Sequence, residues 1–192
     1  MGRYWLLGTS AVQQNKPKII AFANQKGGVG KTTTTLNLAA AFCERGRKVL
    51  ILDLDPQGNA STGLGSVAED REFTTYDVLS GGLIEDQFII KTDVENLHII
   101  PSTVDLSSAD IEFAATKDRS KLLERAINNS DVTFYDYIFF DCPPSLSVLT
   151  VNALIAADSL VIPLQSEFYA LEGLSQLLLS VREIRSAGNP DL

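Results

Sequence analysis

Short apolar runs recur along this chain, separated by segments whose apolar residues follow helical spacing. Each run has the length of a strand, and a continuous apolar run is typical of a strand buried on both faces, as in a parallel sheet. The runs predict strands at residues 19–23, 49–52, 97–101, 137–140 and 159–163.

The segments between the runs predict helices. After the first run, Leu36, Ala39, Ala40 and Cys43 fall at i, i+3, i+4 and i+7, and Gly46 then supplies a stop signal. Further helices are predicted at 75–82, 105–115 and 119–128, and a long one with an apolar face of Leu171, Leu174, Leu177, Leu178, Val181 and Ile184. Residues 61–66 are predicted to form a loop and 69–72 a charged surface stretch. Strands that alternate with helices predict an α/β fold with a doubly wound, mostly parallel sheet.

The segment between the first strand and the first helix is rich in glycine. Residues 24–33 read Asn-Gln-Lys-Gly-Gly-Val-Gly-Lys-Thr-Thr. The second half of the common phosphate-binding loop is present as Gly30-Lys31-Thr32, but Gln25 stands where its first glycine belongs. Glycines still let the backbone approach a polyphosphate, and N–H groups at the start of a helix form a nest for anions. The predicted nucleotide contacts are Lys26, Gly27, Gly28, Val29, Gly30, Lys31, Thr32 and Thr33.

Three side chains of this loop have distinct chemistry. Lys31 is placed to reach the β- and γ-phosphates of ATP, and the Thr32 hydroxyl is placed to ligate Mg²⁺. Lys26 is an extra cation that an ordinary loop does not need. It indicates a dimerisation switch driven by ATP rather than a generic nucleotidase.

Acidic residues follow two of the predicted strands. Asp53 and Asp55 come at the end of the second run, where α/β sheets bind ligands. Asp141 follows the run 137–140, which is the Walker B arrangement that holds Mg²⁺ directly or through water. Loop aspartates often only cap turns, but two of them beside a phosphate-binding strand favour a functional site.

These motifs together resemble the deviant Walker A, A′ and B motifs of the ParA/Soj chromosome- and plasmid-partitioning ATPases. The resemblance lies in residues 26–32, 53–59, 141–146 and 163–174, and it covers about residues 18–192. MinD shares the lysine loop but not the Asp-Pro-Gln-Gly-Asn sequence of residues 55–59. The nitrogenase iron protein also shares the loop, but it holds a cluster through cysteines, and this chain has only Cys43 and Cys142.

The resemblance implies a role for each matching residue. Lys26 would cross a dimer interface to the ATP phosphates of the partner, and Asp55 would position or polarise the attacking water. Asp53 would contact Mg²⁺-bound water. The implied catalytic residues are therefore Lys26, Lys31 and Asp55, and the implied Mg²⁺ contacts are Thr32, Asp53 and Asp141.

The resemblance also implies a cellular role. A cytoplasmic, nucleoid-associated ATPase would form an ATP-dependent homodimer, hydrolyse ATP slowly, respond to a ParB-like partner and bind DNA without sequence preference. Relatives continue beyond the position of Leu192 with segments for adenine and DNA, so the resemblance implies a chain truncated at its C-terminal end. Two alternatives are a MinD-like membrane switch, which needs a C-terminal amphipathic helix, and a scaffold that positions a protein cluster and hardly hydrolyses ATP. Asp55 argues against lost hydrolysis.

Composition narrows these expectations. The net charge is −8, from 24 acidic and 16 basic residues, which argues against a nucleic-acid footprint on these residues. The basic cluster 45–48 is interpreted as a solvated helix end, and no apolar run is long enough to span a membrane.

Residues 1–17 are predicted to be a flexible extension, with a short anchor through 4–7 as the alternative. His98, the only histidine, is interpreted as structural, and two distant cysteines suit a reducing compartment.

Overall fold

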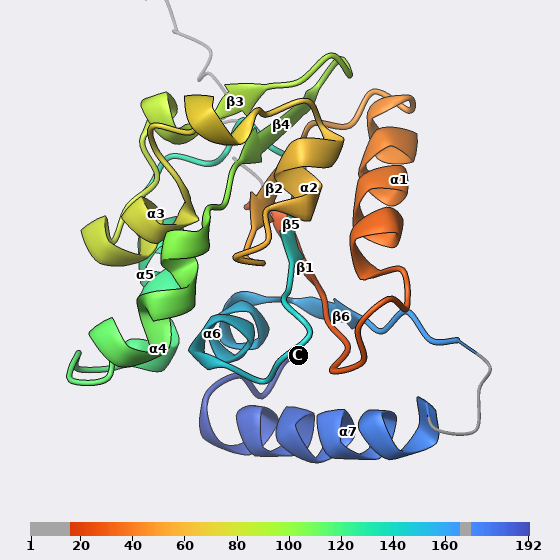
Figure 1. Cartoon of the computed structure of the whole chain (residues 1–192), viewed down its shortest axis with the longest axis vertical. Helices are drawn as coiled ribbons and strands as arrows, with labels where there is room; N and C mark the ends of the chain where they lie inside the picture. The colour runs from red at the N-terminus through yellow and green to blue at the C-terminus, as the bar shows by residue number, and fades with distance from the viewer. Residues whose placement is uncertain (1–15, 166–169) are drawn as a thin grey trace, which may run out of the picture.

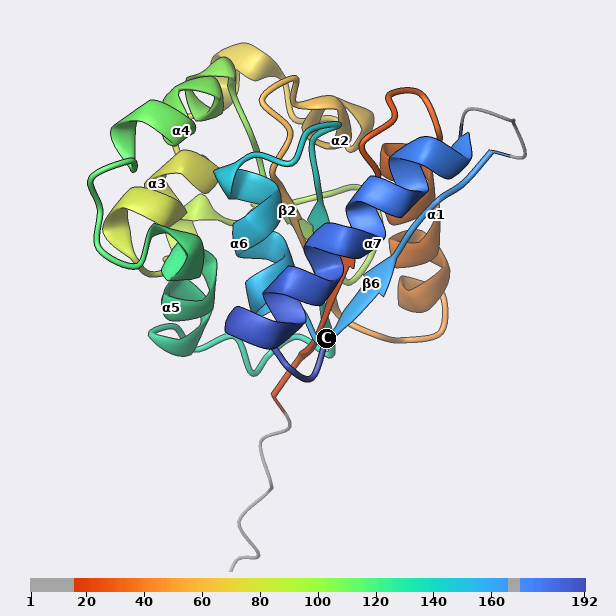
Figure 2. The ribbon, with the colours of Figure 1, turned by 90° about the horizontal axis from the view of Figure 1, so that it is seen from below.

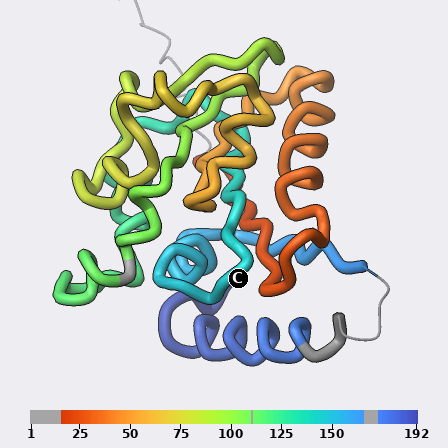
Figure 3. Tube along the Cα trace, in the orientation of Figure 1, coloured from red at the N-terminus to blue at the C-terminus, as the bar shows by residue number. Residues whose placement is uncertain are grey.

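A computed structural model of the chain describes residues 16–165 and 170–192, and Figure 3 traces its course from end to end. Its strands are β1 (Lys18–Phe22), β2 (Val49–Asp53), β3 (Ile90–Lys91), β4 (Leu97–Ile100), β5 (Tyr137–Asp141) and β6 (Ser159–Val161). Its α-helices are α1 (Lys31–Cys43), α2 (Asn59–Gly63), α3 (Thr75–Gly81), α4 (Ala109–Glu112), α5 (Leu122–Asn128), α6 (Val148–Ala156) and α7 (Ala170–Ala187). Short 3₁₀ turns are η1 (Ala68–Asp70), η2 (Asp86–Phe88), η3 (Val104–Ser108) and η4 (Arg119–Lys121).

The strands form one sheet in the order β3-β4-β2-β5-β1-β6. All pairs are parallel except the two-residue β3, which runs antiparallel to β4. The predicted α/β fold with a mostly parallel sheet is therefore confirmed, and each predicted strand is present within one or two residues of its expected bounds. Strand β3 was not predicted, because two residues are too few to show a pattern.

Helices cover both faces of the sheet (Figure 1). Ile20 and Phe22 of β1 face α1 and α2, and the Phe22 and Phe139 rings lie 5.0 Å apart in this layer. Ile19 and Ala21 point to the opposite face, where they join the core with residues of α3, α5 and α6. This alternation buries both faces of the central strands, which is why those strands read as continuous apolar runs.

Several predicted elements need correction. The loop prediction is wrong for 61–63, which belong to α2, because buried tertiary hydrogen bonds hold this short turn in helical form. The predicted helix 105–115 is a 3₁₀ turn followed by the four-residue α4, and 119–128 likewise begins as a 3₁₀ turn before α5. Helix α6 was not predicted.

The long C-terminal helix is confirmed, but its predicted apolar face is only partly buried. Leu177 is fully buried and Ile184 is 8% exposed, whereas Leu178 is 44% exposed. Leu178 therefore lies at the exposed margin of the predicted apolar face, because only a narrow stripe of α7 packs against α6. The side chain of Leu171, residues 166–169 of the family-like stretch and residues 1–15 lie outside the described residues.

The N-terminal extension was predicted to end at residue 17. Of this stretch the structure describes only Lys16 and Pro17, and Pro17 is buried. None of the described helices is both long and apolar enough to cross a membrane.

The parallel strands bring the loops that follow β1, β2 and β5 to one edge of the sheet, shown along the upper edge of Figure 2. The loop before α1 also lies beside the N-terminal half of α7 (Figures 1 and 2). This edge carries the motifs singled out in the sequence.

Candidate functional site

The glycine-rich loop connects β1 to α1 and has the backbone that an anion nest needs. Gly28 and Gly30 have φ angles of 72° and 86°, in the left-handed region where residues with a side chain are strained. Gly30 is the N-cap of α1, and its carbonyl accepts the first helical hydrogen bond from the Thr34 N–H at 2.8 Å. The free N–H groups of the first turn therefore start at the end of this loop.

Two amide side chains hold the loop in place. Asn24 is 3% exposed; its Nδ2 donates to the Pro163 carbonyl at 2.8 Å, and its Oδ1 accepts from the Lys26 N–H at 3.0 Å. Gln165 donates from Nε2 to the Gly28 carbonyl at 3.2 Å. The segment after β6 thus fixes the loop at both ends. No sequence pattern predicted this role of Asn24, because only the fold brings Pro163 beside it.

Lys31 is the buried cation of the site. It is 7% exposed, and its Nζ donates to the Lys26 carbonyl at 3.1 Å. Burial lowers the pKa of Lys31, and the charges of Asp141 and Asp55 partly offset this effect. A buried ammonium group near two carboxylates is a site for phosphate oxygens, which would supply the negative charge directly.

Asp141 at the end of β5 accepts two hydroxyl hydrogen bonds from α1. Thr32 Oγ1 donates to Asp141 Oδ2 at 2.7 Å, and Thr35 Oγ1 lies 2.9 Å from Oδ1. Burial raises the pKa of Asp141 to about 6, although these hydrogen bonds act in the opposite direction. The structure thus brings together Thr32 and Asp141, two of the residues predicted to contact Mg²⁺; the metal contact itself stays a prediction. Thr35 was not anticipated, although it lies one turn after Lys31 on the buried face of α1.

Asp53 is fully buried and holds the chain that follows β2. Its Oδ1 accepts from the Asp55 N–H at 3.1 Å, and its Oδ2 accepts from the Ser61 N–H and hydroxyl at 2.9 and 2.6 Å. Burial raises the pKa of Asp53 to about 7. These three contacts are all to the protein itself, so the contact of Asp53 with Mg²⁺-bound water stays a prediction.

A cavity of about 760 Å³ opens beside the loop, large enough for a nucleotide-sized ligand. Asp55 is 8% exposed and lines it together with Lys31 and Thr32. Its lining residues are Gly27, Gly28, Gly30, Lys31, Thr32, Thr33, Asp55, Pro56, Gln57, Asn59, Ser107, Pro143, Pro144 and Ser145. Ser107 comes from η3, and nothing in its local sequence signalled the site.

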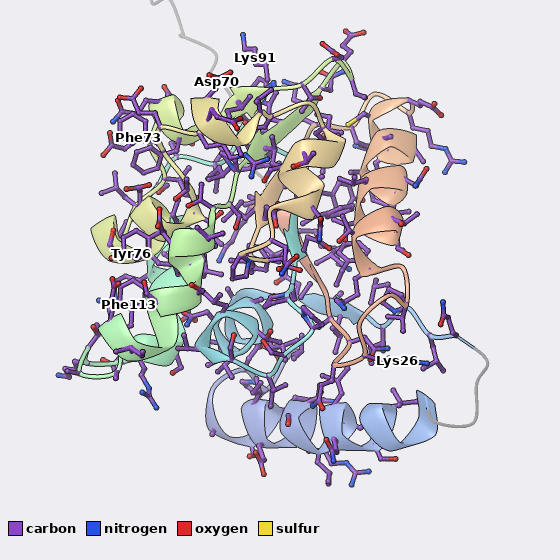
Figure 4. The ribbon with its side chains drawn as sticks, in the orientation of Figure 1. Lys26, Asp70, Phe73, Tyr76, Lys91 and Phe113 are labelled. Atoms are coloured by element: carbon purple, nitrogen blue, oxygen red, sulfur yellow. The ribbon has the colours of Figure 1, made fainter. Side chains whose placement is uncertain are left out.

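Four predicted site residues are not among those that line this cavity: the Mg²⁺ contacts Asp53 and Asp141, and the nucleotide contacts Val29 and Lys26. Val29 is 6% exposed and packs inward, so its predicted contribution is through its backbone. Lys26 is half-buried on the loop and is not among the residues that line the cavity. Figure 4 shows it at the outer edge of the loop, between the sheet and α7.

These residues fit a magnesium nucleotide. The loop supplies N–H groups and a buried ammonium group for phosphates, while the Thr32 hydroxyl and Asp141 carboxylate supply the hard oxygen atoms that Mg²⁺ prefers. Among the described residues there is no group of three or more His, Cys, Asp or Glu that could hold a metal ion. A magnesium ion here would therefore depend on phosphate oxygens and water for its remaining ligands.

The two cysteines and the histidine have no part in this cavity. Cys43 and Cys142 are both buried free thiols, and burial raises the pKa of each. His98 pairs through Nδ1 with the Tyr135 hydroxyl at 2.8 Å and stacks on Phe134, in accord with its structural interpretation.

Comparison with known proteins places the chain among nucleotide-dependent proteins. A family model described as an AAA domain matches residues 17–192. The sporulation initiation inhibitor protein Soj of Bacillus subtilis is 53% identical over 175 residues, which cover 91% of this chain and 69% of Soj. The chromosome partitioning protein ParA of Caulobacter vibrioides is 48% identical over 179 residues, which cover 93% of this chain and 67% of ParA.

Solved structures give the same fold. Cobyrinic acid a,c-diamide synthase from Mycobacterium smegmatis, with bound ADP and magnesium, superposes with a TM-score of 0.86 at 38% identity, covering 92% of this chain and 71% of its own. A putative plasmid partition protein from Borrelia burgdorferi bound to AMPPNP superposes with a TM-score of 0.79 at 32% identity, covering 89% and 72% of the two chains.

Proposed function

The chain belongs to the family of ParA and Soj partitioning ATPases, and from this membership we propose that it is an ATP-dependent dimerisation switch that hydrolyses ATP slowly during the partitioning of chromosome or plasmid DNA. The observation that carries the proposal is one cavity lined by the glycine loop, Lys31, Thr32 and Asp55. ADP with magnesium in one structural neighbour and AMPPNP in another support ATP and Mg²⁺ as its ligands.

The residues of the cavity divide the work of hydrolysis. Lys31 neutralises charge on the β- and γ-phosphates, and the loop N–H groups hold those phosphates in a fixed orientation. Asp55 orients the water that attacks the γ-phosphate in line with the leaving group. Thr32 and Asp141 would hold the magnesium ion, which when bound offsets the negative charge that grows on the phosphate oxygens. Phosphoryl transfer of this kind depends on positioning and charge neutralisation rather than on covalent catalysis.

The same reasoning extends to partners. Lys26 of each subunit would complete the site of the other subunit, and a ParB-like protein would accelerate hydrolysis and so reset the switch. DNA binding, in turn, would depend on basic residues that these 192 residues, with a net charge of −8, supply poorly. The protein would accordingly act in the cytoplasm at the nucleoid.

Two substitutions test the division of roles. Lys31→Ala should abolish ATP binding, because it removes the main counter-charge of the phosphates. Asp55→Ala should retain ATP but lower phosphate release by about 10²–10⁴-fold, the usual effect of losing one positioned catalytic group. A fluorescent ATP analogue measures affinity, and a coupled assay measures phosphate.

Matched controls are the exposed Lys91→Ala and Asp93→Ala, both in the β3–β4 region away from the cavity. Unchanged affinity in Lys31→Ala would refute the nucleotide site. Phosphate release at the wild-type rate from Asp55→Ala would refute its role in hydrolysis.

A further inference from the structure

A hydrogen-bonded network outside the sequence motifs holds the backbone of Asp55. We propose that Ser102 and Arg71 are positioning residues for ATP hydrolysis: they fix the backbone of Asp55, and through it the place of its carboxylate in the cavity. The inference rests on the proposed role of Asp55 in orienting the attacking water. It names two residues that none of the motifs includes.

In the first part of the network, both backbone groups of Asp55 form hydrogen bonds. Its N–H donates to the Asp53 carboxylate at 3.1 Å, and its carbonyl accepts from the Ser102 hydroxyl at 2.6 Å. The carbonyl also accepts from the Gly58 N–H at 2.9 Å, which closes the turn after Asp55. With both groups bound, the backbone from which the Asp55 side chain enters the cavity is fixed, and the carboxylate itself accepts from the Gln57 N–H at 3.0 Å.

Ser102 joins this turn to the rest of the sheet edge. It follows β4, is fully buried, and donates its own N–H to the Ser61 hydroxyl at 3.0 Å. That hydroxyl in turn donates to the Asp53 carboxylate at 2.6 Å. Ser102 therefore contacts Asp55 directly and, through Ser61, also contacts the acid that holds the Asp55 N–H. A buried network whose members are all bonded is rigid, since breaking one bond leaves a buried polar group unpaired.

Arg71 holds the backbone of Ser102 through a hydrogen bond to its carbonyl. Its guanidinium donates from Nη1 to the Ser102 carbonyl at 2.7 Å and from Nη2 to the Ser66 carbonyl and the Thr62 hydroxyl at 2.7 and 2.9 Å. The side chain comes from the segment 69–72, which was predicted to be a charged surface stretch. That prediction is wrong for Arg71, because its planar fork is half-buried among these acceptors.

The guanidinium also lies against the turn that carries Asp55. A Cβ atom at Gly58 would lie 2.3 Å from Arg71 Nη1 and 3.0 Å from the Ser102 carbonyl oxygen. Gly58 has a φ angle of 63°, so the turn and the arginine fit together only because no side chain separates them. Arg71 thus packs over the turn and binds its neighbour at the same time.

Ser102→Ala is the direct test, because it removes one hydroxyl and leaves the Ser102 N–H and carbonyl bonds in place. Phosphate release at saturating ATP and Mg²⁺ should fall about fivefold to tenfold, the effect of one hydrogen bond on a rate. Affinity for a fluorescent ATP analogue should change less than twofold. Ser130→Ala is the matched control, since its hydroxyl bridges the Ile84 N–H and the Ala126 carbonyl away from the cavity.

The decisive readout is a double-mutant cycle with Asp55→Ala. If Ser102 acts through Asp55, Ser102→Ala should cause no further loss of phosphate release once the carboxylate has gone. Independent, multiplicative losses, or an equal loss in Ser130→Ala, would show a merely structural role and overturn the inference. Slow release from Asp55→Ala with a normal rate in Ser102→Ala would overturn this inference and leave the proposed function intact. A normal rate in Asp55→Ala would overturn both.

Arg71→Lys provides a second variant if Ser102→Ala does not fold. It keeps the charge but cannot reach all of the guanidinium's acceptors, so the same cycle with Asp55→Ala should again show no further loss. Its control is Arg47→Lys, an exposed arginine paired with Asp136 at 3.4 Å. Normal phosphate release from Arg71→Lys, or a loss that multiplies with that of Asp55→Ala, would remove Arg71 from the network.

Discussion

Two buried carboxyl groups, Asp53 and Asp141, face each other across neighbouring strands at the edge of the sheet that carries the cavity. Burial raises the pKa of Asp53 to about 7 and that of Asp141 to about 6. The unliganded protein therefore carries acidic side chains whose charge is costly near neutral pH.

The raised pKa of Asp141 predicts how the stability of the protein changes with pH. This pKa is about 6 in the folded state against 3.8 as the ordinary value, so between these values the folded protein binds more protons than the unfolded chain. The stabilising effect of the bound proton is complete below about pH 4 and is lost as the pH rises through about 6. Asp141→Asn removes this titration, so the variant should gain roughly 1–3 kcal/mol relative to wild type between pH 4 and pH 7.

Urea unfolding of both proteins at several pH values, without nucleotide or Mg²⁺, measures this difference. Asp93→Asn, an exposed aspartate, is the control and should show no comparable trend. If the free energies of unfolding of wild type and Asp141→Asn run parallel with pH, the Asp141 carboxyl is not the group responsible.

At this scale the sequence predicted the residues whose chemistry is local. Lys31 and Thr32 belong to a loop whose backbone conformation suits a phosphate group, and Asp55 follows a strand whose carboxyl end must lie near that loop. Thr35 and Ser102 could not be predicted in the same way. Their roles depend on which strand stands beside α1 and on where the chain after β4 meets β2.

Among the elements, the short helix α2 shows how a turn can depend on a single glycine. Gly58 precedes α2 with a left-handed φ of 63° and has the Ser102 carbonyl and Arg71 against it, whereas Gly65 has a φ of 83° and open space around it. Gly65→Ala should therefore cost only the backbone strain, roughly 1–2 kcal/mol. Gly58→Ala should cost about 1–3 kcal/mol more, because the new methyl group is overpacked.

Urea unfolding of the two variants separates the cost of backbone strain from the cost of overpacking, since backbone strain is common to both. Similar losses in the two proteins would mean that the loop around Gly58 moves aside without cost. The Arg71 contact would then be too weak to position anything.

The elements that the sequence predicted well are those with a pattern longer than a turn. The central strands show continuous apolar runs because helices cover both of their faces, and the predicted apolar face of α1 has Ala39 and Cys43 buried and Leu36 and Ala40 half-buried. The short elements α2, β3 and α4 span five, two and four residues, so no period can be read from them. They are held by tertiary contacts that the sequence does not display.

At the scale of the whole molecule, charge bears on the proposed switch. The chain has a net charge of −8, and a bound nucleotide would add more negative charge at the cavity. Two copies that approached each other through this face would repel each other unless cations lay between them. In the proposed switch, Lys26, on the loop but outside the cavity lining, would supply such a cation to the other copy, while Lys31 would serve the phosphates of its own copy.

Lys26→Ala should therefore separate nucleotide binding from dimerisation. Binding of a fluorescent ATP analogue to the monomer should remain within about threefold, because Lys26 is only half-buried and lies outside the lining of its own copy's cavity. Dimer formation with Mg²⁺ and a slowly hydrolysed ATP analogue, measured by sedimentation velocity, should be lost.

Lys91→Ala is the control, because Figure 4 shows Lys91 at the opposite end of the molecule from Lys26. If Lys26→Ala sediments as a dimer like wild type, the extra lysine is an ordinary loop residue. Another group must then offset the repulsion between the two nucleotides.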